Sequence, residues 1–351
     1  MDKKYLITII VIIIIIGLGI TAICLCKKEK PTDNYTTSNN VVLSLEDTIK
    51  DDTIWCGTFN LIWNDLKNDL AKQDIVFTPQ LEEVINLNKG TFSTKDLNDA
   101  SYYKAYGHPT LEFKKELEKG VKEKFNETSD ILDDFDWNGS MDDYILYTML
   151  KKVFNFNTPF DKLKDSNFKD TENVKYFGIN DKSNNKMRNQ VTVLYYDENG
   201  YAVKLSTKEN DEVILVKGDD SSTFLEVYNN ILAKESNYDK KTFTKNDSLR
   251  IPNLKMNIKK SFDQLINKPF LFANGDEYYI GKAIQTIKFE LDNKGGKIKS
   301  EAGMQVYKNS AMPSNTKRSF NFDDTFIIFL KEEEKDLPYF AAKISDIKQF
   351  Q

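Results

Sequence analysis

Residues 280–291 read IGKAIQTIKFEL, and the turn-forming tract DNKGG follows at 292–296. Apolar Ile287, Phe289 and Leu291 alternate with polar residues, a period of two that predicts a half-buried β-strand. Beyond the turn, a second alternation puts small or apolar residues on one face, at Gly296, Ile298, Ser300 and Ala302. The charged residues Lys297, Lys299 and Glu301 occupy the other face. The residues after Gly295 are therefore predicted to be able to join a sheet as an extra strand.

A polar loop and two apolar runs follow this tract. Residues 303–319 are mostly polar and predict an exposed loop. Residues 326–330 (FIIFL) and 337–344 (LPYFAAKI) are rich in apolar and aromatic side chains, as expected for strands buried in a core.

This C-terminal part resembles serpins, a large family of protease inhibitors. Residues 282–295 are similar to the family's strand that leads to a hinge glycine, and residues 296–302 occupy the place of its small-residue hinge. Residues 320–326 (FNFDDTF) are similar to its Phe-x-Ala-Asp-x-Pro-Phe signature, with Phe322 in the Ala place and Thr325 in the Pro place. Residues 337–344 take the place of its last buried strand.

Upstream segments extend the resemblance in the same order. Residues 121–132 (VKEKFNETSDIL), 144–150 (YILYTML) and 155–160 (NFNTPF) are similar to the family's helix end, central sheet strand and Trp-x-x-Pro-Phe segment, with Phe156 in the Trp place. Residues 251–256 look like another serpin strand. The resemblance covers roughly residues 50–351. It implies an α+β fold with a large mixed β-sheet, smaller sheets, surrounding helices and an exposed reactive loop.

Periodicity predicts the remaining elements. Helices are expected at 55–70, at 80–87 with Thr78-Pro79 at its start, at 111–125 and at 223–232. Asn199-Gly200 predicts a hairpin between strands 191–196 and 201–205. Further strands are expected at 144–150, buried on both faces, and at 212–216 and 249–258.

The N-terminus predicts a membrane anchor. Residues 5–26 carry no charge and span about 33 Å as a helix, enough to cross a bilayer. The alternatives are a cleaved signal peptide and a lipoprotein with a modified Cys24. The predicted organisation is a tail at 1–4, an anchor at 5–26, a polar linker at 27–48 and a serpin-like domain at 49–351. Lysines flank the span on both sides, so charge alone does not favour an exported domain. The resemblance and the polar tract 31–40 favour the extracytoplasmic side of the cell membrane.

Composition weighs against several other classes. The 351 residues carry a formal net charge of −5, which argues against a nucleic-acid partner. His108 is the only histidine, so it would have to serve any Ser-His-Asp triad. Asp134, Asp136, Asn138 and Asp142 begin like a calcium loop, but Ile145 stands where a bidentate Glu is needed. No enzyme activity, metal or cofactor is predicted, and Cys56 is predicted to be a small buried side chain.

The resemblance implies a mechanism. In the family, a protease cuts the loop, and the loop's N-terminal half inserts into the main sheet and traps the acylated protease. The hinge here is Gly295, Gly296, Ile298, Ser300 and Ala302. Counting from Gly295 puts the cut at Asn309, and counting back from Phe320 puts it near Ser314; the candidate region is Lys308, Asn309, Ser310, Met312 and Ser314.

Two further points stay open from the sequence. Thr78, Thr148 and Gln285 match the polar cluster at which the family's sheet opens, and all three can both donate and accept hydrogen bonds. The hinge, however, lacks the family's usual Thr or Ser and its run of Ala. The leading hypothesis is an inhibitor of an unknown serine or cysteine protease, acting as a monomer. The alternative is a non-inhibitory surface protein of the same fold, used in binding or scaffolding.

Overall fold

The computed structural model describes residues 40–298 and 317–351. The predicted tail, the anchor at 5–26 and the candidate cleavage residues lie outside these ranges. Within them, no helix is long and apolar enough to cross a membrane. Val41, Leu43 and Leu45 are buried, and the Trp55 indole N–H donates to the Leu43 carbonyl at 3.3 Å. The folded unit therefore begins before residue 49, where the sequence analysis placed its start.

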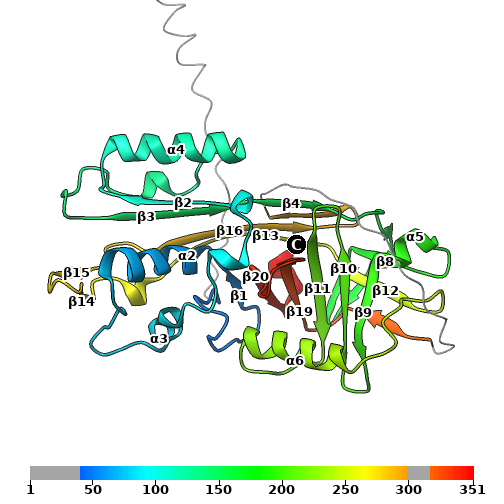
Figure 1. Ribbon diagram of the computed structural model, residues 1–351. Helices are drawn as coiled ribbons and strands as arrows, with labels where there is room; N and C mark the ends of the chain where they lie inside the picture. Colours follow the sequence, from blue (N-terminus) through cyan, green and yellow to red (C-terminus); the bar gives the residue numbers. More distant parts are fainter. Residues whose placement is uncertain (1–39, 299–316) are drawn as a thin grey trace, which may run out of the picture. The chain divides into compact units, whose positions relative to one another are not determined.

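The largest sheet has six antiparallel strands, and it contains the apolar runs predicted near the C-terminus (Figure 1). Its strands, in spatial order, are β1 (Ile54–Cys56), β20 (Phe340–Ile344), β19 (Phe326–Glu332), β11 (Asp211–Lys217), β10 (Tyr201–Ser206) and β9 (Val191–Tyr196). β9 and β10 form the hairpin predicted at Asn199-Gly200. Helix α6 (Phe224–Ser236) contacts β9, and its Phe224 and Tyr228 rings pack on Phe329.

A second sheet contains the strand predicted within residues 280–291. It consists of β13 (Leu254–Ser261), β16 (Ile284–Leu291), β17 (Gly295–Ile298) and β4 (Lys152–Asn155). A separate pair, β2 (Tyr102–Gly107) and β3 (Ile145–Leu150), continues it, because only Lys151 separates β3 from β4. The large sheet implied by the resemblance is thus divided along the line between β3 and β16.

Smaller sheets complete the strand list. One contains β18 (Ser319–Asn321), β12 (Ser248–Pro252), β8 (Tyr176–Ile179) and β5 (Asp161–Lys162), and its β12–β18 pair is parallel. Two hairpins are formed by β6 (Ser166–Phe168) with β7 (Thr171–Val174), and by β14 (Pro269–Leu271) with β15 (Glu277–Tyr279). The strand predicted at 249–258 is two strands in different sheets, because the chain leaves β12 at Pro252, which has no amide hydrogen to donate.

The remaining helices are α2 (Thr58–Asp65), extended by the π-helical turn η1 (Leu66–Ala71), α3 (Glu82–Lys89), α4 (Leu111–Phe125) and α5 (Asn185–Arg188). The predicted α4 is confirmed, with the Thr110 hydroxyl capping the Phe113 N–H at 3.1 Å. The helix predicted at 55–70 begins later, because Ile54–Cys56 pair with β20. The helix predicted at 80–87 begins at Glu82, and Thr78 does not cap it.

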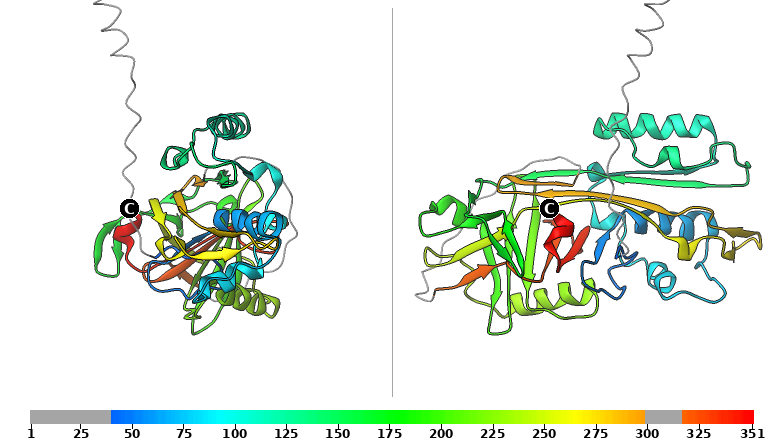
Figure 2. Two further views of the ribbon diagram at one scale, coloured as in Figure 1. Left: turned by 90° about the vertical axis from the view of Figure 1, so that its left-hand side faces the viewer. Right: turned by 180° about the vertical axis from the view of Figure 1, so that it is seen from behind.

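Two helices cover opposite faces of the divided sheet. α2 contacts β3 on one face, and α4 contacts β2 on the other (Figure 2). β3 is accordingly not buried throughout: Ile145 and Tyr147 are buried toward α4, whereas Leu146 and Thr148 are only half-buried. The side chains under α4 form a small core of their own, separate from the main one, with members Leu117, Val121, Leu132, Trp137, Ile145 and Tyr147.

Candidate functional site

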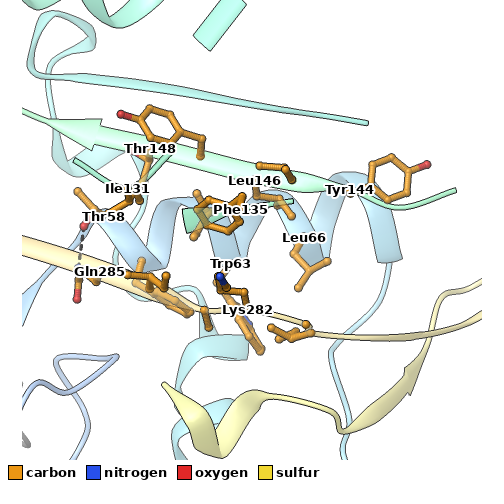
Figure 3. Close-up of a pocket in the computed structure, with 18 of the residues that line it drawn as sticks. Thr58, Trp63, Leu66, Ile131, Phe135, Tyr144, Leu146, Thr148, Lys282 and Gln285 are labelled. Carbon is orange, nitrogen blue, oxygen red and sulfur yellow. Dashed lines mark hydrogen bonds between the residues drawn. The ribbon is translucent and has the colours of Figure 1, made fainter. Parts of the chain in front are cut away.

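A cavity of about 980 Å³ lies between β3 and β16, along the line that separates the β2–β3 pair from the four-stranded sheet that contains β16 (Figure 3). Its inner wall is α2, which contributes Phe59, Ile62 and Trp63. Its sides are the facing strands, including Leu146 and Thr148 of β3 and Gln285 of β16. At one end it reaches Ile298, the last residue of β17. The cavity therefore continues the line of β17.

Both strands present open edges to this cavity. Within the described ranges, β3 pairs only with β2, and the ladder between β16 and β17 covers only Glu290 and Leu291 of β16. The edge of β16 from Ile284 to Phe289 is therefore unpaired on the cavity side. Two unpaired edges are a template for an added strand, because their amide and carbonyl groups lack ladder partners.

β17 shows how such a strand fits. It lies between β16 and β4, and its register with β4 runs from Gly295 opposite Asn155 to Ile298 opposite Lys152. Gly296 and Ile298 are buried and Lys297 is exposed, so the alternation predicted after the turn is confirmed for these three residues. Ser300 and Ala302, the other two predicted hinge residues, lie outside the described ranges.

Gly295 is required where this strand begins. Its φ is +155°, and a Cβ atom there would lie 2.1 Å from the Phe154 carbonyl oxygen, far inside contact distance. At Gly296 a Cβ atom would lie 2.4 Å from the Phe154 ring. The paired glycines thus allow the turn to approach β4 closely enough to form the ladder.

A polar cluster lies in the middle of the cavity wall. The Gln285 amide donates to the Thr58 hydroxyl at 2.7 Å and to the Cys56 carbonyl at 3.0 Å (Figure 3). The Thr148 hydroxyl and the Gln285 side-chain carbonyl are buried, and neither has a hydrogen-bond partner among the described residues. These two atoms are the unsatisfied polar groups of the wall, and leaving such groups buried costs stability.

The structure brings together two of the three residues predicted for this cluster. Thr148 and Gln285 both line the cavity, whereas Thr78 is exposed in the loop before α3 and does not line it. The residue that sequence analysis missed is Thr58. The sequence did contain a signal for Thr58, because Gly57-Thr58 stands directly before an apolar helical pattern and could start a helix there.

The segment at residues 129–136 covers the cavity from the α4 side. Ile131 and Phe135 line the cavity (Figure 3). Two of the segment's carboxylates form ion pairs with the other half of the sheet: Asp130 lies 3.2 Å from the Lys288 ammonium, and Asp134 lies 2.7 Å from that of Lys259. Lys282 also donates to the Asp134 carbonyl. This segment therefore connects the two halves of the divided sheet.

Lys152, which faces Ile298 in the ladder, belongs to a buried charge cluster. Its ammonium group contacts Asp211 and lies 2.9 Å from a Glu332 carboxylate oxygen. The two carboxylates are also cross-strand neighbours on β11 and β19. Burial raises the pKa of Asp211 to about 6, although the Lys152 charge and hydrogen bond work in the other direction. The Tyr339 hydroxyl donates to Asp211 at 3.1 Å.

Of the other residues singled out in the sequence, Cys56 lines the cavity and its carbonyl belongs to the polar cluster, whereas His108 is not among the lining residues. A ring nitrogen of His108 lies 3.1 Å from the Asp143 carbonyl, and its ring packs on Tyr144. Cys56 is buried, and burial raises the pKa of its thiol. In the part of the chain that the structure describes, no group of three or more His, Cys, Asp or Glu residues is placed to hold a metal ion.

Comparisons with known proteins give structural similarity only. No family model and no curated protein sequence matches the chain. Among solved structures, it is similar to a thyroxine-binding globulin in complex with thyroxine (15% identity, TM-score 0.42), covering 67% of this chain and 64% of that one. Human thyroxine-binding globulin (12%, TM-score 0.44) and Serpin48, a highly specific serpin of the insect Tenebrio molitor (13%, TM-score 0.38), each match with 72% of this chain and 78% of theirs covered.

The fold assignment rests on the arrangement itself. The strand before Gly295, the hinge strand beside it and the two buried C-terminal strands all lie where the sequence resemblance requires. Helix α4 lies across the divided sheet, where it contacts β2, again as the resemblance implies. The chain therefore has a serpin-like α+β fold.

Proposed function

We propose that the protein traps a serine or cysteine protease, through cleavage and insertion of the loop 296–319. The observation that carries this proposal is the cavity between β3 and β16, which lies in line with β17 and between two unpaired strand edges. Cleavage frees the N-terminal part of the loop to fill this cavity as a strand, with the acylated protease attached to its end.

The register supports a single strand of this kind. Ile298 faces Lys152 and Lys297 faces Glu290, and each ladder can be continued one residue at a time. Both continuations reach residue 302, which then faces Thr148 on one side and Gln285 on the other. Agreement between the two ladders is the condition for one antiparallel strand to pair with both edges.

Hydrogen bonding and apolar burial would drive strand insertion. An inserted strand would form ladder hydrogen bonds with both open edges and would bury apolar surface on α2. The uncut protein is then a metastable state, separated from the inserted state by a barrier. Continuing the alternation of Gly296 and Ile298 would put the small residues Ser300 and Ala302 on the inward face of the inserted strand, where they would suit packing against the helix.

One observation favours the alternative, a non-inhibitory surface protein used in binding or scaffolding. Three of the five hinge residues, Gly295, Gly296 and Ile298, already lie in β17 in the uncut chain, and Ile298 is 4% exposed. The initial step of insertion is therefore complete before any protease arrives, and it adds nothing to the energy released after cleavage.

The test is to treat the purified full-length protein with trypsin and with an elastase. Inhibition predicts a covalent complex that survives denaturing electrophoresis, together with nicked protein whose melting temperature is higher than that of uncut protein. Nicking within 299–316 without a complex and without a rise in melting temperature would overturn insertion. A rise without a complex would favour the non-inhibitory alternative.

The location of the protein is a separate proposal. We infer from the uncharged span at 5–26 that the chain is anchored in the cell membrane, with the serpin-like domain on the extracytoplasmic side. Protease treatment of intact cells tests it, because a domain left untouched by external protease would lie inside the cell.

A further inference from the structure

The far end of the cavity, away from Ile298, is built from aromatic side chains of two segments. Tyr144 directly precedes β3, and Tyr278 lies on β15, with 6.3 Å between their ring centroids. The Phe272 ring stacks on Tyr278, with 3.9 Å between the centroids. All three rings line the cavity, and Figure 3 shows Tyr144 at the end opposite Thr148. These three rings form the aromatic end of the cavity.

Carboxylates surround this aromatic end. Those that line the cavity are Asp130, Asp136, Asp142, Asp143, Asp276 and Glu277. Asp130 is paired with Lys288, whereas the other five form no ion pair with any described residue. The other lining lysine, Lys282, donates to the Asp134 carbonyl. Burial raises the pKa of the Tyr278 hydroxyl, and the charges of Asp276 and Asp142 raise it further, so carboxylates of both segments lie near this ring. The aromatic end therefore carries a surplus of negative charge.

Apolar side chains form the middle of the cavity. Helix α2 and its π-helical extension contribute residues that are spaced by three or four and therefore share one helix face, namely Phe59, Ile62, Trp63 and Leu66. Ile131 and Phe135 cover them from the α4 side. The volume of about 980 Å³ is near the upper limit for small-molecule sites, about 300–1,000 Å³. The cavity therefore has the size and the apolar lining of a ligand site.

The inner part of the cavity offers hydrogen-bonding atoms that lack a partner among the described residues. Gln285 is 5% exposed, and its side-chain carbonyl oxygen can only accept a hydrogen bond. The Thr148 hydroxyl can donate or accept. Thr148 follows Tyr144 by four residues, roughly 13 Å along the strand. A ligand that carries a hydrogen-bonding group at that distance from the aromatic end would satisfy at least one of these atoms.

We propose that the cavity binds a small cationic amphiphile, with its ammonium group at the aromatic end and its apolar chain along α2. Aromatic faces and unpaired carboxylates both attract an ammonium ion, and the apolar wall removes the chain from water. A hydroxyl or amide group roughly 13 Å from the ammonium then meets Gln285 or Thr148. The carboxylates repel an anionic amphiphile such as a fatty acid. This site goes beyond the function proposed above, because the uncut protein binds the ligand without cleavage or insertion.

The test is isothermal titration calorimetry of the uncut full-length protein in phosphatidylcholine nanodiscs at neutral pH. The probes are hexylamine, decylamine, 10-amino-1-decanol and decanoate. Empty nanodiscs give the heat of probe partitioning into lipid, which is subtracted. Because no protease is present, the result does not depend on whether the loop inserts after cleavage. The ligand site and the proposed function can therefore fail independently.

One double variant and a matched control locate the ammonium group. D142N/E277Q removes one carboxylate from each of the two segments that form the aromatic end. D220N/E334Q is the control, because both residues are exposed, do not line the cavity and change the net charge by the same amount. A difference between the two double variants therefore reports on the position of the lost charges and not on their number.

Decylamine should bind wild type about a hundredfold or more tightly than hexylamine, because each buried methylene strengthens binding about fourfold. D142N/E277Q should bind decylamine about three- to fivefold more weakly than wild type and D220N/E334Q. Equal affinities for the two amines, equal affinities of the two double variants, or decanoate binding as tight as that of decylamine would each overturn the site. The amino alcohol should bind wild type at least as tightly as decylamine, and weaker binding would overturn the contact with Gln285 or Thr148.

Discussion

Replacing Thr148 with Val should stabilise the uncut protein, which is unusual for a change in a protein interior. The Thr148 hydroxyl is buried and has no hydrogen-bond partner in the described part of the chain, and Val has nearly the same shape. An unsatisfied buried polar group costs about 1–3 kcal/mol, and its removal should return about 1 kcal/mol. For a domain of this size that corresponds to a rise in melting temperature of roughly 2 °C.

Thr58→Val is the matched control with the opposite expected sign. The Thr58 hydroxyl accepts the Gln285 amide at 2.7 Å, and its loss leaves that amide with the Cys56 carbonyl alone. We expect T58V to lower the melting temperature of the uncut protein by a similar amount.

The assay is differential scanning calorimetry at one fixed scan rate, applied to uncut wild type, T148V and T58V. A fixed rate matters because a metastable protein unfolds at a rate-dependent temperature. If T148V melts below wild type, as T58V should, the Thr148 hydroxyl has a partner and the description of the cavity wall is wrong.

Three further predictions concern the cavity and its surroundings. Gly295→Ala should expel β17 and make the hinge itself susceptible to protease, because the new Cβ atom would meet the Phe154 carbonyl at 2.1 Å; limited proteolysis that leaves this site uncut contradicts it. The folded-state pKa of Asp211 is about 6, above its usual 3.8, so the free energy of unfolding should rise as pH falls through 6. Through Asp211 the uncut protein should be about 1 kcal/mol more stable at pH 5 than at pH 7, and D211N should lose this difference. Urea unfolding of wild type and D211N at the two pH values measures it, and an equal difference in both proteins would contradict the role of Asp211. Asp134→Asn and Asp130→Asn should each speed insertion after nicking about two- to fivefold, because both residues form ion pairs across the cavity. Asp346→Asn is the control and should not change the rate, because the Asp346 carboxylate accepts the Lys348 N–H near the C-terminus, away from the cavity. Insertion is followed by stopping the proteolysis at set times and measuring the melting temperature, and equal rates for all three variants would count against the bridging role.

Local signals explain which elements were predictable from the sequence. The bounds of α4 follow from apolar residues spaced four apart and from the Thr110 cap, and both signals lie within the helix or directly beside it in the sequence. The outcome differs at Trp55, whose apolar spacing suits a helix equally well. Its neighbourhood is a strand because it pairs with Ala341, a partner near the other end of the chain that no local pattern reveals.

The same distinction applies to the site. The alternation of Gly296, Lys297 and Ile298 predicted how the hinge faces its surroundings. It did not predict that these residues already lie in the sheet, because that depends on the backbone of β4 opposite them. Thr78 and Thr58 both stand beside a helix start, so choosing between them required knowing which helix lies beneath the cavity.

The small core under α4 has a consequence for how the sheet widens. Because β2, β3 and α4 share apolar contacts among themselves, they can shift as one body about the end where Leu150 pairs with Tyr102, since both residues pack with the main core. The free energy lost at the start of widening is then confined to the seam, where Ile131, Phe135 and a few lysine–carboxylate contacts meet the opposite strands. The rate of widening should accordingly respond to ionic strength far more than global unfolding does.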